Sequence, residues 1–362
     1  MGESLAKSAA LAIAVLLAGA VSAAAQRVPI DTNPDPDELR NIFTFQVEND
    51  FFNVYGRSDR DYTNGIRLGW LSPALPDLPD PIANMVTFPT FFGEGRPSSV
   101  TRRVGISLGQ NIYTPQDTAT SLPIYNDRPY AAWLYLSFAL QQTYKRVNPE
   151  TKKEEPLRQD TVALDLGLIG PAAGGEFVQN NFHRLIGDAP SMGWANQLYN
   201  EPTINLTFER RWRVARGTAI TDPKLEYDVV PWLGLTAGNV SDYVSAGGVV
   251  RIGKELQNDF GPPRPRPALP GSEGFIGQGF GWYLFAGLGG EAVAHNIFLD
   301  GNTGGGSIVA VGHRPFVGQA QAGFTVLFSG VRINFTQVLR TPEFFQRDRY
   351  DLFGSISVTF RY

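Results

Sequence analysis

Residues 352–362 read LFGSISVTFRY, and most of this stretch alternates large apolar side chains with small or polar ones. Successive side chains of an extended strand point to opposite faces, so a period of two gives each face its own composition. One face of this segment carries serine, threonine and arginine. The other face carries the apolar residues Leu352, Ile356, Val358, Phe360 and Tyr362. The stretch therefore predicts a β-strand with one apolar and one polar face.

The same alternation appears in residues 41–50, 62–71 and 159–169. In a soluble β-sandwich the apolar face of such strands would form the core. In a membrane barrel it would face lipid, and the polar face would line the lumen. Strands of about ten residues exceed the usual sandwich length and match the length that spans a bilayer. Aromatic residues near the strand ends, as in interfacial girdles, also favour the barrel: Trp70, Trp212, Trp232, Tyr243 and Tyr350.

The pattern predicts an all-β fold, a transmembrane antiparallel β-barrel of about twelve strands, with a short helix in an extracellular loop. An even number of strands is expected for such a barrel. The expected strands lie near 41–52, 61–72, 101–113, 129–144, 159–169, 203–214, 225–237, 241–253, 279–297, 314–328, 330–341 and 350–362.

The amino end reads as an export signal. Lys7 precedes an apolar run over 9–20, and Ala23-Ala24-Ala25 supplies an A-x-A cleavage site. We therefore expect residues 1–25 to be a signal peptide and residues 26–362 to form the barrel in the bacterial outer membrane. A soluble exported protein is the alternative that the signal alone leaves open.

Composition excludes several functions. Charged residues make up 18% of the chain and the formal net charge is -4, so the chain has no excess of positive charge to attract nucleic acid. The chain has no cysteine, which excludes disulfides, thiolate metal sites and a cysteine nucleophile. We expect a membrane-embedded monomer with no nucleic-acid partner.

If both termini are periplasmic, the loops after the first, third and fifth strands are extracellular and converge on one rim. Asn49 and Asp50 begin the first loop, and Thr63 lies where that loop ends. Arg128 lies in the second loop. Each also has a structural interpretation: an Asn-Asp turn, a bulge at Asn64-Gly65 and a surface ion pair of Asp127 with Arg128.

The third loop, residues 170–202, predicts a short helix over Gly175–Ile186 between Gly174 and Gly187. Gln179 and His183 are four residues apart and so share one face of that helix. A lone histidine is more often structural, but this one would face Asn49 and Asp50 across the rim. A neutral imidazole can deprotonate water, an Asn amide can donate to an oxyanion, and Asp50 offers oxygen to Ca²⁺. Together these groups predict a water-activating esterase.

The segments VENDFF, DRDYTNGIRLGW, YTP…DRPYAAWLY and GLIGPAAGGEFVQNNFHRLIG resemble the outer-membrane lipid A deacylase family (LpxR). The resemblance covers roughly residues 41–202, with strand-only similarity beyond. It implies a twelve-stranded barrel that removes the 3′-acyloxyacyl chain of lipid A, within lipopolysaccharide, by Ca²⁺-dependent ester hydrolysis. It also assigns family roles: His183 as the catalytic base, Gln179 and Asn49 as catalytic groups, Asp50 as metal ligand, and Thr63 and Arg128 as substrate-binding residues.

One family feature is missing. A member of the family carries a Lys-Arg pair in the second loop, whereas residues 116–126 contain neither lysine nor arginine. Arg128 aligns with a separate arginine of the family.

Two other functions compete with the esterase. A non-catalytic barrel, either a small channel or a structural protein, would keep the alternation without needing Gln179 and His183 on one face. An outer-membrane phospholipase would need a serine beside a histidine. Ser58 and Ser191 are loop serines, but neither lies in a recognisable nucleophile motif.

Overall fold

The computed structural model describes residues 28–52, 61–75, 97–149, 154–219, 224–265, 274–277 and 279–362, with the single residues 152 and 222. The expected signal peptide over residues 1–25 lies outside these ranges. So does Ser58. Within the described residues, no helix has both the length and the apolar character needed to cross a membrane.

Strands dominate the chain, and short helices occur between some of them. The strands are β1 (Ile42–Asn49), β2 (Asp61–Leu71), β3 (Ser99–Thr114), β4 (Ala131–Val147), β5 (Glu154–Ile169), β6 (Glu201–Trp212), β7 (Ala215–Thr218), β8 (Glu226–Gly238), β9 (Ser241–Lys254), β10 (Gly281–Asn296), β11 (Phe316–Phe328), β12 (Val331–Arg340) and β13 (Asp351–Arg361). The α-helices are α3 (Gly175–Ile186) and α4 (Ile297–Asp300), and the 3-10 turns are η2 (Asp50–Phe52), η3 (Pro171–Ala173), η4 (Gly193–Asn196) and η5 (Leu256–Asn258).

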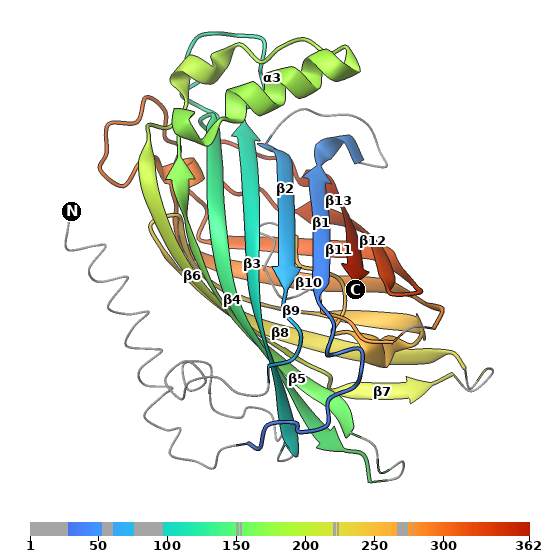
Figure 1. Ribbon diagram of the computed structural model, residues 1–362. Helices are drawn as coiled ribbons and strands as arrows, with labels where there is room; N and C mark the ends of the chain where they lie inside the picture. The colour runs from blue at the N-terminus through green and yellow to red at the C-terminus, as the bar shows by residue number, and fades with distance from the viewer. Residues whose placement is uncertain are drawn as a thin grey trace.

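The strands form one antiparallel sheet that closes on itself (Figure 1). β1 pairs with β13, and β6 pairs with β8, so each strand of the wall has two neighbours. β7 continues the line of β6 beyond a short break and pairs with β8 alone. The wall is thus a closed barrel of twelve strands, as the alternation predicts. β7 and the short α4 are elements that the sequence pattern did not reveal.

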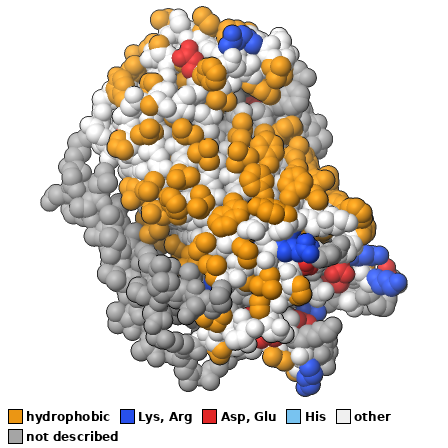
Figure 2. Space-filling view, in the orientation of Figure 1, with side chains coloured by type: hydrophobic (Ala, Val, Ile, Leu, Met, Phe, Trp, Pro, Cys, Tyr) orange, Lys and Arg blue, Asp and Glu red, His pale blue; other side chains and the backbone are white. Residues whose placement is uncertain are grey.

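The burial pattern excludes the soluble sandwich. The apolar faces of the strands point outward: the side chain of Phe45 is 41% exposed and that of Leu108 is 49% exposed. The polar faces point inward, where Gln46 and Arg67 are buried and hydrogen-bonded to each other. Figure 2 shows the outward apolar side chains gathered in a band across the strands. A soluble protein rarely exposes so large an apolar surface, whereas a membrane barrel requires it.

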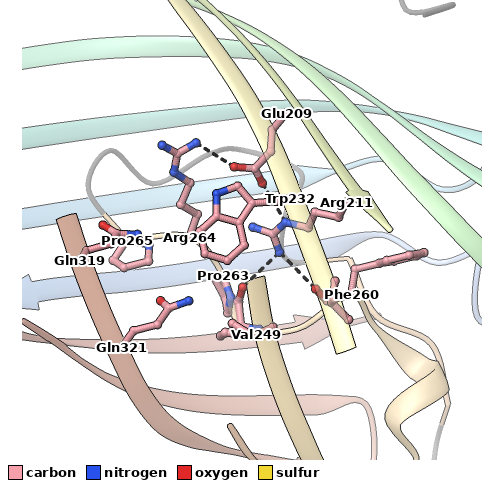
Figure 3. Close-up of a pocket in the computed structure, with 12 residues that line it drawn as sticks. Glu209, Arg211, Trp232, Val249, Phe260, Pro263, Arg264, Pro265, Gln319 and Gln321 are labelled. Carbon is pink, nitrogen blue, oxygen red and sulfur yellow. Dashed lines mark hydrogen bonds and ion pairs between the residues drawn. The ribbon is translucent and has the colours of Figure 1, made fainter. Parts of the chain in front are cut away.

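Ion pairs fill the lumen. Glu209 accepts hydrogen bonds from Arg211 at 2.8 Å and from Arg264 at 2.7 Å, beside a small pocket (Figure 3). Arg264 also lies 3.8 Å from Glu291, which pairs with Arg340 at 2.5 Å. Each of these charges therefore has a partner of opposite sign, which buried charges need.

Two segments close the barrel at the end where β1 begins and β13 ends. In the segment before β1, Glu38 pairs with Lys145 of β4 at 2.5 Å. In the segment after β9, Asp259 pairs with Arg332 at 3.1 Å and accepts a hydrogen bond from Tyr283 at 2.8 Å. These contacts hold loop residues inside the lumen, so the described part of the barrel is plugged rather than open.

Candidate active site

The opposite end of the barrel carries α3, which contacts β3 and β4 (Figure 1). Near the middle of the wall the outward side chains of these two strands, such as Leu108 and Leu136, are exposed. Near the rim the same outward positions are occupied by Ile112 and Ala132, and both are fully buried. The loop that contains α3 therefore lies against the outer surface of the wall, not over the lumen.

The helix begins and ends at glycines that adopt left-handed backbone. Gly174 has φ 72° and Gly187 has φ 80°, and the Gly187 amide donates to the His183 carbonyl. Both ends of the helix therefore lie where the glycine spacing predicts. At the first helical position, a Cβ on Gly175 would lie 2.4 Å from the Cβ of Ala132. Only a glycine lets the helix approach the wall this closely.

A small apolar cluster anchors the loop to the wall. Its buried members come from β3, from the start of β4 and the residue before it, and from the loop itself: Ile112, Tyr130, Ala132, Ala173 and Trp194. Gln110 of β3 adds a hydrogen bond from its amide nitrogen to the Ala173 carbonyl at 2.7 Å. The side chains of α3 that face the wall are thereby held in fixed positions.

His183 lies on the wall-facing side of α3, with only 4% of its surface exposed. Its Nδ1 is 2.6 Å from the backbone carbonyl oxygen of Ala189. A carbonyl can only accept, so Nδ1 carries the proton in the neutral ring and Nε2 carries the lone pair. This is the tautomer that a general base needs.

Gln179, one helical turn earlier, is also buried on this side. Its Oε1 accepts a hydrogen bond from the indole nitrogen of Trp194 at 2.9 Å. Because an indole can only donate, this contact fixes which end of the amide is oxygen. The amide nitrogen of Gln179 is buried and makes no hydrogen bond within the described residues. This N–H group is therefore available to donate a hydrogen bond to a bound ligand, as an oxyanion site requires.

Asn49 and Thr63 meet where β1 pairs with β2. Asn49 is opposite Asn64, and the register of β2 against β3 shifts between Tyr62 and Asn64. The bulge expected at Asn64-Gly65 therefore falls at Thr63, whose hydroxyl lies 2.7 Å from that of Thr114. Asn49 occupies an outward position of β1, the same side as the exposed Phe45.

Asp50 follows Asn49 directly as the first residue of η2, and its side chain is buried. The preceding Glu48 faces the lumen instead, where its carboxylate accepts hydrogen bonds from Tyr62 at 2.5 Å and Gln46 at 2.7 Å. Within the described residues, no group of three His, Cys, Asp or Glu side chains could hold a metal ion. Asp50 itself offers a buried carboxylate, an oxygen ligand of the type that a hard cation prefers.

The structure thus places five of the six predicted residues in two groups at one rim of the barrel. Strand pairing brings Asn49, Asp50 and Thr63 together, and α3 carries Gln179 and His183. Asn64 completes the first group: it is buried, and its side-chain oxygen has no hydrogen-bond partner in the described part of the chain. Sequence reasoning passed over Asn64 as a bulge residue, although it lies in the same DRDYTNG segment as Thr63.

Arg128 does not join either group. Its guanidinium is buried and pairs with Glu343 at 2.6 Å. It lies near the rings of Tyr113 and Phe344, at 5.7 Å and 5.6 Å from their centres. Tyr113 belongs to the inward face of β3. Arg128 is therefore oriented toward the lumen, and its predicted substrate contact stays a prediction.

The other two histidines form a separate cluster around α4, with His295 near the end of β10 and His313 in the loop before β11. His295 and His313 place Nδ1 at 3.2 Å and 2.8 Å from the carboxylate of Asp300. Burial of Asp300 on its own would raise its pKa, but hydrogen bonds from His295, Asn296 and His313 outweigh burial and lower the pKa to about 2. Asp300 therefore stays ionised, and both imidazoles are held on it.

A closed barrel with an apolar belt and a charged, plugged lumen defines an outer-membrane protein of the barrel class. The chain belongs to the LpxR family, since the family model described as "Outer membrane protein LpxR" matches residues 10–362. No match is found among curated protein sequences.

The likeness to a solved structure of the same family supports this fold. LpxR from Salmonella typhimurium superposes with a TM-score of 0.66 at 22% identity, over 88% of this chain and 99% of that chain. The beta domain of the Bordetella autotransporter Brka gives a TM-score of 0.39 at 10% identity, over 89% and 98% of the two chains. The translocator domain of the autotransporter NalP from Neisseria meningitidis gives 0.37 at 9% identity, over 99% and 98%.

Proposed function

We propose that this protein is a lipid A 3′-O-deacylase of the outer membrane, which hydrolyses an acyl ester of lipopolysaccharide with His183 as general base. The observation that carries this proposal is the hydrogen bond between Nδ1 of His183 and the carbonyl oxygen of Ala189. It gives a buried histidine a fixed tautomer on the outer wall of a membrane barrel. Membership of the LpxR family supports the substrate class.

The reaction follows from these positions. Nε2 of His183 takes a proton from water as the water oxygen bonds to the ester carbonyl carbon. The negative charge that develops on the carbonyl oxygen accepts hydrogen bonds from the amide nitrogens of Gln179 and Asn49. When the carbon–oxygen bond to the sugar breaks, the protonated His183 returns the proton to the departing sugar oxygen. The products are a free fatty acid and a sugar hydroxyl.

The family also implies Ca²⁺, and the buried carboxylate of Asp50 is an oxygen ligand of the type that Ca²⁺ prefers. Asp50 would hold the ion with neighbouring amide, hydroxyl and carbonyl oxygens. A bound Ca²⁺ would supply positive charge to polarise the ester carbonyl.

The location outside the lumen agrees with this substrate. A lipid substrate can keep its acyl chains in the membrane while its ester reaches a site on the outer wall. A site inside the lumen would require the whole lipid to leave the bilayer. With α3 facing the cell exterior, the site would lie at the leaflet where lipopolysaccharide resides, and a single barrel would suffice.

The competing functions have less support. A channel needs an open lumen, whereas ion pairs and two inserted segments fill the described part of this one. A serine phospholipase needs a base next to its nucleophile. The Ser191 hydroxyl is buried and makes no hydrogen bond within the described residues, so no histidine activates it there.

The decisive experiment is mass analysis of lipid A from cells that express the protein. We expect a species that has lost one acyloxyacyl group with the wild-type chain and none with His183→Ala. The rate should fall by about 10²–10⁴-fold, the usual contribution of a general base. His313→Ala is the matched control and should retain activity, because His313 lies in the other histidine cluster. Full activity of a folded His183→Ala barrel would refute the assignment.

A second experiment addresses the metal. Treatment with a calcium chelator should abolish deacylation by the purified enzyme, and added Ca²⁺ should restore it. Asp50→Asn removes the carboxylate charge, so we expect a higher Ca²⁺ concentration for half-maximal activity and weaker Ca²⁺ binding in calorimetry. Chelator-resistant activity together with normal activity of Asp50→Asn would contradict a calcium site at this residue.

A further inference from the structure

One side of α3 is apolar but exposed. Val178, Phe182 and Leu185 are spaced by four and three residues, so they line one side of the helix together with Ile186. Val178 is half-buried, whereas Leu185 is 82% exposed, more than any other large apolar side chain among the described residues. Phe182 and Ile186 are 37% and 40% exposed, so this row, called the apolar stripe below, is only partly covered by the described part of the chain.

The stripe lies beside the wall-facing side of the helix. Positions 175, 179 and 183 are buried against the wall, and the polar residues Glu176, Asn180 and Arg184 follow on the side away from the stripe. One side of the helix therefore packs on the barrel, one carries polar residues with the exposed Phe177 beside them, and one is apolar and partly exposed. A helix with an apolar and a charged side is the type that lies in a membrane interface.

Packing shows which way the stripe points. Val178 at its start packs against the same apolar cluster as Leu134 of β4. Leu134 is an outward residue, and the next outward residues of β4 toward the middle of the wall are Leu136 and Phe138, which are exposed in the lipid-facing band. The stripe therefore continues the apolar band of the barrel instead of pointing into the lumen. Figure 1 shows α3 at the end of these strands.

We propose that α3 is an interfacial helix whose apolar stripe inserts into the hydrocarbon boundary of the adjacent membrane leaflet. The continuity of the stripe with the lipid-facing band identifies membrane hydrocarbon as its occupant. The proposal concerns membrane contact and does not depend on ester hydrolysis. Its consequence is that the lipid surface on one side and the barrel wall on the other hold the helix at the membrane boundary.

The absence of cysteine from the chain allows a direct test. Leu185→Cys, in the stripe, and Arg184→Cys, on the polar side, give two neighbouring positions for the environment-sensitive fluorophore NBD. Leu136→Cys, in the lipid-facing band, serves as the positive control. Each full-length labelled barrel is reconstituted in phosphatidylcholine vesicles, with and without lipids that carry a nitroxide quencher near the top of the acyl chain.

We expect blue-shifted emission and strong nitroxide quenching at position 185, as at position 136. At position 184 we expect water-like emission and several-fold weaker quenching. Water-like, unquenched emission at position 185 would overturn the proposal. So would emission that is blue-shifted but insensitive to the lipid quencher and lost on dilution of the protein, because that result would identify a second copy as the occupant.

Phe182→Cys repeats the measurement at a second position of the stripe. Heat-modifiable gel migration verifies that each labelled barrel is folded. Because the readout is fluorescence, a failure of this proposal is distinguishable from a failure of the proposed enzymatic function, which lipid A analysis reports separately.

Discussion

At the scale of single residues, one backbone group and one side chain fix the orientation of the two α3 residues in the candidate site. The carbonyl of Ala189 sets the tautomer of His183, and the indole of Trp194 sets the orientation of the Gln179 amide. Neither partner has chemistry of its own in the proposed reaction. Each hydrogen bond excludes one alternative: the other tautomer of His183 or the flipped amide of Gln179. Fixing such groups before the substrate binds is how a preorganised site lowers an activation barrier.

Trp194→Phe tests the orientation of Gln179. The phenyl ring keeps most of the apolar packing but cannot donate to Gln179, so the amide is free to turn its oxygen toward the substrate. We expect kcat to fall about tenfold with little change in KM, less than the roughly 10²–10³-fold loss typical when an oxyanion donor is removed.

The matched control is Trp70→Phe, which removes an indole hydrogen bond to Asn41 at the far end of β2. It should leave kcat unchanged. If Trp194→Phe lowers the yield of folded barrel while the folded fraction keeps wild-type kcat, the role of Trp194 is packing alone.

At the scale of elements, the packing of α3 on the barrel wall sets the position of the side chains that the helix carries. Gly175 is the closest point of approach, where a Cβ would lie 2.4 Å from Ala132 and 2.6 Å from Trp194. Gly187 at the other end also has a positive φ, but a Cβ there would meet nothing within 4 Å. The two glycines therefore have different roles: one permits close packing and the other ends the helix.

Gly175→Val should displace the helix from the wall and abolish deacylation, while strand pairing keeps the barrel folded. Heat-modifiable migration reports the barrel, and limited proteolysis of the loop over residues 170–200 reports the helix. Gly187→Asn is the control, because asparagine tolerates left-handed backbone and the site is open. An active, protease-resistant Gly175→Val variant would show that the contact with Ala132 does not position the helix.

At the scale of the whole molecule, the barrel has its apolar surface outside and its charged residues inside, the reverse of a soluble globular protein. The lumen charges are satisfied by one another: Arg128 by Glu343, Glu343 by Arg340, and Arg340 by Glu291. Removing one member of such a buried pair leaves an uncompensated charge and costs about 3–5 kcal/mol. The lumen therefore acts as the polar core of the protein and not as a path for solutes.

This arrangement predicts that the folded protein conducts no ions. After reconstitution in planar bilayers we expect no stepwise conductance, because the described lumen holds paired charges and inserted loop segments. Heat-modifiable migration of the same preparation verifies that folded barrels were added. Stable conductance steps that scale with the amount of protein would restore the channel alternative.

The predicted site residues show how far sequence can reach. Gln179 and His183 could be placed on one helix face because their spacing is local, and Asn49 and Thr63 could be placed at one rim because neighbouring strands are antiparallel. Asn64 was missed because a register shift at Thr63 depends on how β2 meets β3. For Arg128 the sequence predicted a substrate contact and did not reveal its ion pair with Glu343. The two residues are far apart in the chain, and only folding brings them together.

The sequence by itself determined the twelve strands of the barrel and the helix between Gly174 and Gly187, because alternation and glycine punctuation act over a few neighbouring residues. Only the tertiary structure decided that α3 packs on the outer wall, that β1 closes on β13, and that Ala189 and Trp194 fix the two key side chains. The physical reason is range. Strand and helix signals are local, whereas closure, lumen ion pairs and site orientation depend on contacts between residues that the fold, not the chain order, makes neighbours.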